Sequence, residues 1–246
     1  MLNRPFIPVI SRWAIPFSDS RYPKDPEEAK SAQEIAERLD QVPAMSATVL
    51  GLEMLLHEPC LDLRLAAEVV LSDVGASIQV LRLIGREFEF VAERPRRMVE
   101  CLASLDVKCW FAAISAQTYA CDREHSKTAT LWNHSRLVAQ YAELVAHSFH
   151  SISPEDAYLV GLLHEVESFP TVLGWPDCGA GGRTTGFMVA TEEALPPFVV
   201  AAMREVNDSD ASSTWKFILT AAHGLAGIHT EDQGFLHEGK DSAECR

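Results

Sequence analysis

The sequence has little positive charge for its size. Its 246 residues include 35 acidic and 21 basic side chains, a formal net charge of −14 with histidine neutral. Non-specific binding to DNA or RNA needs clustered lysine and arginine to displace counterions, and anionic membrane surfaces select the same residues. We therefore expect no nucleic-acid partner and no membrane partner, and we interpret the acidic surface as a solvated one.

Cysteine pairs and long apolar runs are also missing. No two of the six cysteines have the C-x-x-C spacing of a zinc or redox site, and most lie in apolar helical contexts, which predicts reduced thiols in the core. No apolar run approaches the roughly 20 residues of a membrane span. Residues 1–13 do not have the pattern of a signal peptide. These absences predict a cytoplasmic protein.

Strand signals are equally scarce. The chain has no sustained two-residue alternation and no Asn-Gly or Asp-Gly hairpin. Apolar residues instead recur at helical spacing behind capping residues, which predicts an all-α fold. The predicted helices cover residues 25–39, 46–56, 63–71, 74–84, 98–105, 107–119, 129–149, 154–163, 196–206 and 212–228.

Composition also suggests a division of the chain. We expect an irregular, proline-containing arm over residues 1–24, a helical domain over 25–230 and a polar tail over 231–246. A polar interval near residues 120–128 predicts a seam between an N-terminal bundle and a C-terminal half. The two parts are residues 25–121 and 122–230. The glycine-rich segment 174–186 predicts a mobile flap or a poorly ordered connection.

The most informative stretch is residues 153–166. It begins with Ser-Pro-Glu-Asp, a strong helix start signal in which Ser153 is the expected N-cap. Residues 157–163 are apolar on every side, which predicts a helix inside the molecule. His164 and Glu165 follow at its inner end, where polar groups are costly to bury without partners. They either bind something or form hydrogen bonds within the core.

No common catalytic motif is present: the chain has no G-x-x-x-x-G-K-[ST], H-E-x-x-H or G-x-S-x-G. Two more histidines, His134 and His223, lie in the long helix and the last helix. If they meet His164 and Glu165, the group offers ligands for a divalent transition metal, which could activate a water for hydrolysis. The alternative is a set of partnered core histidines, and spacing alone favours that alternative.

The arrangement of these motifs resembles a known family. Residues 131–139 and 155–165 resemble the HD-superfamily pattern of two helices that carry His and His-Asp. Three upstream segments resemble the N-terminal half of the HDOD domain, the HD-related output domain of bacterial signalling proteins: residues 42–43, 63–73 and 80–84. The resemblance implies an N-terminal helical bundle packed against an HD-like helical half.

Within the HD superfamily, the pattern His, His-Asp, Asp binds metal and hydrolyses phosphate esters. The resemblance places the first His on His134, the pair on His164 and Glu165, and the last Asp on His223. Glutamate in place of aspartate shifts a ligand oxygen by about a bond length, beyond the roughly 0.2 Å tolerance of a good site. We therefore expect a vestigial metal site with no cofactor and no catalytic residue; the alternative is bound Fe, Mn or Zn.

The resemblance also carries a functional expectation. HDOD domains are generally regarded as regulatory modules without demonstrated hydrolysis. We predict a non-enzymatic bacterial signal-transduction module that acts through a protein partner or a small ligand. The alternative is a divergent metal-dependent phosphohydrolase of a nucleotide or another phosphate ester, with the same four residues as metal ligands.

Overall fold

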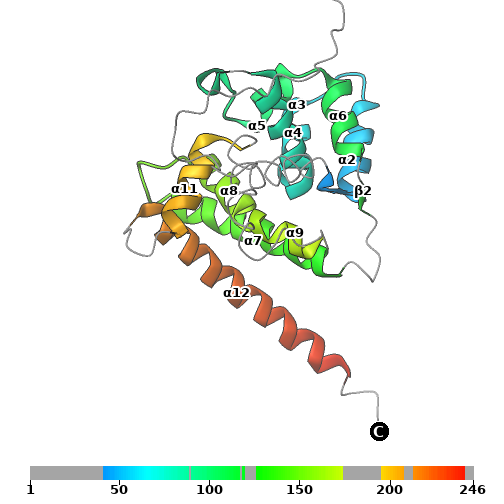
Figure 1. The fold of residues 1–246 in the computed structure, drawn as a ribbon. Helices are drawn as coiled ribbons and strands as arrows, with labels where there is room; N and C mark the ends of the chain where they lie inside the picture. The colour runs from blue at the N-terminus through cyan, green and yellow to red at the C-terminus, as the bar shows by residue number, and fades with distance from the viewer. Residues whose placement is uncertain are drawn as a thin grey trace, which may run out of the picture.

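Helices dominate the computed structural model, which describes residues 41–88, 90–116, 118–119, 126–173, 195–207 and 213–241 (Figure 1). The predicted all-α class is confirmed. The predicted N-terminal arm, the predicted helix over 25–39 and the glycine-rich segment 174–186 lie outside the described residues. The division into domains at the boundaries given above stays a prediction.

The N-terminal half is a bundle of short helices whose starts are capped as the sequence predicts. Asp62, Asp73 and Asp106 each accept hydrogen bonds from backbone N–H groups in the first turn of the helix that follows them. The elements of this half are α2 (Ser46–Leu56), α3 (Leu63–Leu71), α4 (Val74–Glu87), η2 (Val91–Glu93), α5 (Met98–Ser104) and α6 (Val107–Ser115).

A two-residue parallel pairing joins the beginning and the end of this bundle. Strand β1 (Ala44–Met45) pairs with β2 (Thr118–Tyr119), with Ala44 opposite Thr118. The prediction of a helix through residue 119 was therefore wrong, because α6 ends at Ser115. Threonine and tyrosine favour extended backbone, and β1 supplies a partner from far along the chain, which no local pattern encodes.

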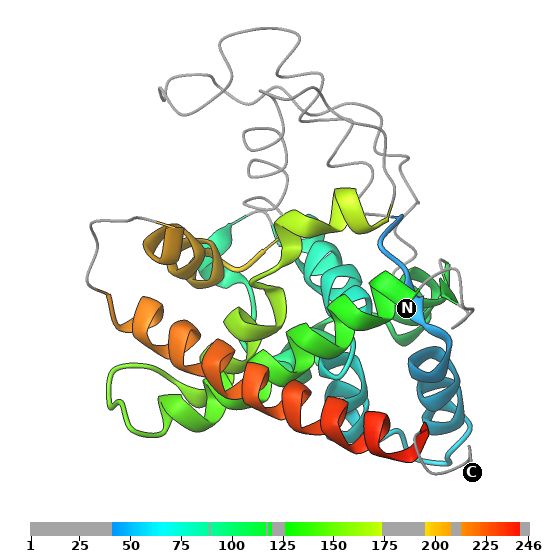
Figure 2. The same cartoon turned by 90° about the horizontal axis from the view of Figure 1, so that it is seen from below.

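The C-terminal half contains longer helices, and α12 lies alongside α7 (Figure 2). Helix α12 continues through the region from Glu231 that was predicted to be a frayed polar tail, and it ends at Asp241. The elements of this half are α7 (Ser126–Ala146), α8 (Pro154–Leu163), η4 (Val166–Ser168), α9 (Phe169–Val172), α11 (Pro197–Asn207) and α12 (Thr214–Asp241).

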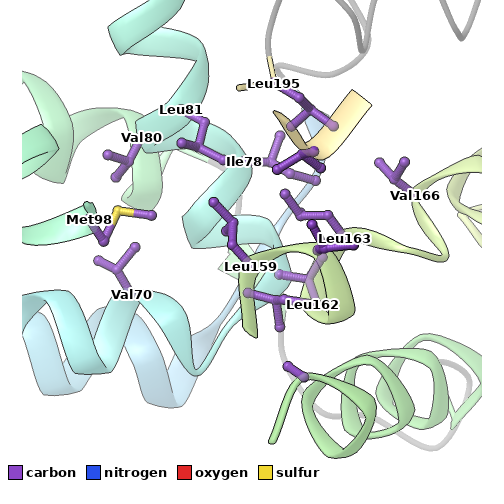
Figure 3. Packing of buried hydrophobic residues seen from close by; sticks show 14 of the residues in the cluster. Val70, Ile78, Val80, Leu81, Met98, Leu159, Leu162, Leu163, Val166 and Leu195 are labelled. Atoms are coloured by element: carbon purple, nitrogen blue, oxygen red, sulfur yellow. The ribbon is translucent and has the colours of Figure 1, made fainter. Parts of the chain in front are cut away.

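Helix α8 lies at the centre of the core. Six of its last seven residues are buried, as the apolar run predicts. Leu159 and Leu163 of α8 lie beside Ile78 of α4, so this helix joins the N-terminal bundle to the C-terminal half (Figure 3). Ser153 stands at the predicted N-cap position, although its side chain makes no capping hydrogen bond.

A buried carboxylate ties the two halves together. One oxygen of Asp73 accepts hydrogen bonds from the backbone N–H of Ala76 and from the indole Nε1 of Trp132 in α7, both at 3.1 Å. The other accepts from the backbone N–H of Met45 at 2.6 Å. Asp73 is only 1% exposed, so these three donors take the place of water. One side chain thus connects β1, α4 and α7.

The described cysteines differ in burial. Of the cysteines that the structure describes, Cys101 is buried, and burial raises the pKa of its thiol to about 12. Cys60 and Cys109 are free and exposed, so the prediction that they lie in the core was wrong.

Within the described residues, no helix combines the length and apolar character that crossing a bilayer requires.

Candidate metal centre

The structure brings the four residues singled out in the sequence to one point. His134 comes from α7, His164 and Glu165 from the end of α8, and His223 from α12. One possible ligand atom from each side chain lies within 4.8 Å of those of the other three. The ring centroids of His164 and His223 are 4.5 Å apart, and that of His134 is 5.4 Å and 5.1 Å from them. We call this group the His/Glu cluster.

A close crossing of α7 and α8 explains why the histidines meet. A Cβ atom built on Gly161 would lie 2.7 Å from the Cα of Ala139 and 3.0 Å from the carbonyl oxygen of Val138. Only glycine allows this approach, because the obstructing atoms are backbone and cannot rotate away. His164 lies one helical turn after Gly161 and His134 lies five residues before Ala139, so the two rings meet just beyond the crossing.

His164 has one nitrogen satisfied and one without a partner. Its Nδ1 lies 2.6 Å from the carbonyl oxygen of Gly161, and because a carbonyl only accepts, Nδ1 must carry the hydrogen. Nε2 then carries a lone pair. This atom is buried, makes no hydrogen bond, and lies 3.6 Å from Oε1 of Glu165, while the side chain is only 7% exposed. The orphaned lone pair faces the other ligands of the cluster.

The electrostatics favour neutral imidazoles. Burial lowers the pKa of His164 to about 4, and the neighbouring His223 contributes to that shift. Burial likewise lowers the pKa of His223, with His134 adding to the effect. Both rings are therefore neutral at pH 7, so the approach of His164 to Glu165 is no ion pair. Neutral imidazole is the form that binds a metal ion.

Glu165 reaches the cluster because the helix has already ended. Helix α8 stops at Leu163, His164 is its C-cap, and Glu165 has φ −98° and ψ 14°, outside the helical region. Its Oε2 accepts a hydrogen bond from the Ser168 hydroxyl at 2.7 Å, which leaves Oε1 on the side of His164. The extra methylene of glutamate does not keep its oxygen out of the cluster. Whether this position is vestigial stays a prediction.

The donor set fits a divalent transition metal. Three imidazoles suit zinc, iron, nickel or copper better than they suit magnesium or calcium, and a single carboxylate is also a common zinc ligand. A tetrahedral ion with ligand bonds of 2.0–2.1 Å spaces its ligand atoms by about 3.3 Å, so the widest pair here, at most 4.8 Å, must move closer. Binding of such an ion would therefore require rotations about the side-chain torsions of the ligands. A bound ion would contribute Lewis acidity at this point.

Sequence reasoning missed two supporting groups. The carbonyl of Gly161 fixes the tautomer of His164, and the hydroxyl of Ser168 orients Glu165. Each lies three residues from the group it supports, a spacing that brings side chains and backbone together in one helical turn. The local signals were therefore present, but they have meaning only once the cluster is known.

The fold is all-α, and its paired helices α7 and α8 bring His134 together with the pair His164 and Glu165, the arrangement that the HD-superfamily pattern describes. The chain then shows a more specific likeness: residues 96–178 match the family model described as the HDOD domain. The match runs from the start of α5 past α9 and includes His134, His164 and Glu165, while His223 lies beyond it. The resemblance drawn from the sequence is confirmed.

Two crystal structures of the MmoQ response regulator from Methylococcus capsulatus str. Bath share this fold. Their TM-scores are 0.60 and 0.61, at 14% and 13% sequence identity. Each match covers 76% of this chain, and 84% and 86% of the respective MmoQ chains. Identity this low establishes the fold alone. No match was found among curated proteins.

Proposed function

We propose that this chain is a non-enzymatic regulatory module of the HDOD type, in which the His/Glu cluster binds a divalent transition metal. The HDOD match and the fold shared with a response regulator support a role in signal transduction. We further propose that the module works in the bacterial cytoplasm through a protein partner or a small ligand. The sequence led us to expect no cofactor, with bound Fe, Mn or Zn as the alternative. The geometry of the cluster favours that alternative.

The observation that carries the metal proposal is the buried Nε2 of His164. A buried polar atom without a hydrogen bond costs about 1–3 kcal/mol, so proteins seldom keep one without a use. Here the orphaned atom faces two other imidazoles and a carboxylate. A metal ion would satisfy it and would also draw together α7, α8 and α12.

The charges around the cluster support a binding role over hydrolysis of phosphate esters. Besides burial and a backbone hydrogen bond, the groups that shift the pKa of His164 are His223, Glu165 and His134. The charged groups that act on His223 are His134 and Glu165. Among the described side chains, none of these groups is an arginine or a lysine, the residues that hold a phosphate group through charge and multiple hydrogen bonds.

A cavity between the two halves supports small-ligand binding. It has a volume of about 300 Å³, the lower end of the range for ligand pockets. Residues of α4, of the segment 92–96 and of the start of α11 form its wall, and the guanidinium of Arg96 lies 5.1 Å from the ring centroid of Phe198. A ligand seated there would contact both halves at once.

The second candidate is a divergent metal-dependent phosphohydrolase, favoured by the convergence of four ligand-bearing side chains. The experiment that separates the two combines elemental analysis of protein purified without chelator with a hydrolysis screen. The screen covers phosphomonoesters and cyclic nucleotides. We expect about one divalent transition-metal ion per chain in the wild type and no hydrolysis above background.

His164→Ala is the test variant and His147→Ala the matched control, because His147 is exposed near the end of α7. We expect the first to lose the metal and the second to retain it. At an ion concentration 100 times its Kd, the wild type should gain about 2.7 kcal/mol of stability, measured by denaturant unfolding, and EDTA should remove it. Metal-dependent hydrolysis abolished in His164→Ala would establish the phosphohydrolase instead. Absence of both metal and stabilisation would disprove metal binding.

A further inference from the structure

We infer that the His/Glu cluster is a closed four-ligand site for a single zinc-class ion, in which Glu165 is the fourth ligand and Ser168 holds it in place. The inference rests on the proposed metal binding and adds a statement about its coordination. The ion would join three helices structurally and would leave no position for a substrate.

The number of protein ligands distinguishes structural from catalytic zinc sites. Structural zinc sites use four protein ligands, whereas catalytic sites use three and keep the fourth position for water or substrate. Here His134, His164 and His223 supply three nitrogens and Glu165 supplies an oxygen, each within 4.8 Å of the others. If all four bind, the shell of a four-coordinate ion is complete.

Whether Glu165 binds decides between a closed site and an open one. Its side chain is 33% exposed, and a side chain this accessible could turn to solvent and leave the fourth position to water. The turn η4 prevents this. The Ser168 backbone N–H donates to the Glu165 carbonyl at 2.9 Å, and its hydroxyl donates to Oε2 at 2.7 Å. Residues three apart in a 3₁₀ turn lie one above the other, so Ser168 stands over Glu165.

The hydrogen bond from Ser168 also selects which oxygen can bind. With Oε2 engaged, Oε1 is the oxygen on the side of His164, 3.6 Å from its Nε2. Hydrogen bonds from outside the ligand shell fix ligand orientation in metal sites, and their loss typically weakens metal affinity about 10- to 100-fold. Ser168 is therefore a positioning residue.

The test replaces the native ion with Co²⁺ in the full chain and records the visible spectrum before and after addition of azide. Four-coordinate Co²⁺ absorbs far more strongly than five- or six-coordinate Co²⁺, and azide changes the spectrum only where a position is open. We expect strong absorption in the wild type that azide does not alter. Zinc affinity is measured in parallel by competition with a chromophoric chelator.

Three variants complete the design. Ser168→Ala should weaken zinc binding about 10- to 100-fold and make the Co²⁺ spectrum respond to azide. Ser168→Thr keeps the hydroxyl and should restore the wild-type spectrum. Ser115→Ala removes a hydroxyl that bonds only within α6 and should change neither measurement. Thermal unfolding of each metal-free variant confirms that the variant folds. If Ser168→Ala does not fold, Glu165→Gln, whose side chain has nearly the same shape as glutamate, takes its place in the test.

The outcomes separate the two proposals. Weak Co²⁺ absorption or an azide response in the wild type would overturn the closed site while leaving metal binding intact. A Ser168→Ala variant that matches the wild type would overturn the positioning role of Ser168. Wild-type protein that retains no Co²⁺ or Zn²⁺ after dialysis would refute the proposed metal function itself.

Discussion

Asp73 and His164 are both buried polar side chains in the same core, and they differ in how they are satisfied. Asp73 accepts three hydrogen bonds, from Met45, Ala76 and Trp132. His164 has one nitrogen bonded to a carbonyl and the other without a partner. A buried polar group whose partners all come from the chain is explained by the fold. One that lies among further ligand atoms without a partner marks a place where an ion or a water molecule from outside the chain would satisfy it.

The largest loss of stability should come from removing the buried carboxylate of Asp73. Asp73→Ala leaves three donors without an acceptor, two of them buried. Each loss costs about 1–3 kcal/mol with partial compensation by water, so we expect a total of about 3–5 kcal/mol. Chemical denaturation measures it. Asp106→Ala is the matched control, since Asp106 is an exposed cap whose carboxylate accepts a hydrogen bond from the backbone N–H of Lys108; its loss should cost about 1 kcal/mol. Equal losses of stability in the two variants would show that the buried carboxylate contributes no more than an exposed helix cap.

A second change should damage the His/Glu cluster while leaving the hydrogen bonds of Asp73 in place. Gly161→Ala places a methyl group against the backbone of Ala139, which forces α7 and α8 apart and costs about 1–3 kcal/mol. Separation of the helices should also lower zinc affinity, measured by competition titration. Gly224→Ala is the control: nothing lies within 4 Å of its added Cβ, and alanine in a helix should stabilise by up to about 1 kcal/mol. Unchanged zinc affinity in Gly161→Ala would show that the crossing does not position the histidines.

The smallest effect should come from the exposed contact between the halves. Arg97 donates two hydrogen bonds of 2.8 Å to Glu155, but both side chains are more than half exposed. Solvent screens such pairs, so Arg97→Ala should cost less than about 1 kcal/mol and the cost should shrink in high salt. Thermal unfolding at two salt concentrations measures it. A loss as large as that of Asp73→Ala would mean that the surface ion pair joins the halves as strongly as the buried carboxylate does.

The helices were predictable because their signals are local. Asp62, Asp73 and Asp106 mark helix starts at their own positions, and the apolar run before His164 indicates burial by itself. The pairing of β1 with β2 was not predictable, because it depends on a partner far along the chain. Cys109 was misjudged because an apolar neighbourhood in sequence does not specify which face of a helix is buried, and Cys60 because it lies in the bend between α2 and α3.

The sequence identified the residues of the candidate site but did not predict how they are arranged. His134, His164, Glu165 and His223 were singled out from the sequence, and the structure brings them together. The length of Glu165 argued against a site because the HD pattern has the shorter aspartate at this position. Its backbone has already left the helix, and Ser168 turns its carboxylate, details that depend on where α8 ends.

The hydrogen bond between Asp73 and Trp132 also bears on the order of folding. Helices α7 and α8 are close neighbours in the chain, so their contacts can form early at little cost in loop entropy. Asp73 and Trp132 are separated by 59 positions in the sequence, and their bond requires both halves to be nearly complete. We therefore expect Trp132→Phe to accelerate unfolding much more than it slows folding, as for a contact made after the rate-limiting step.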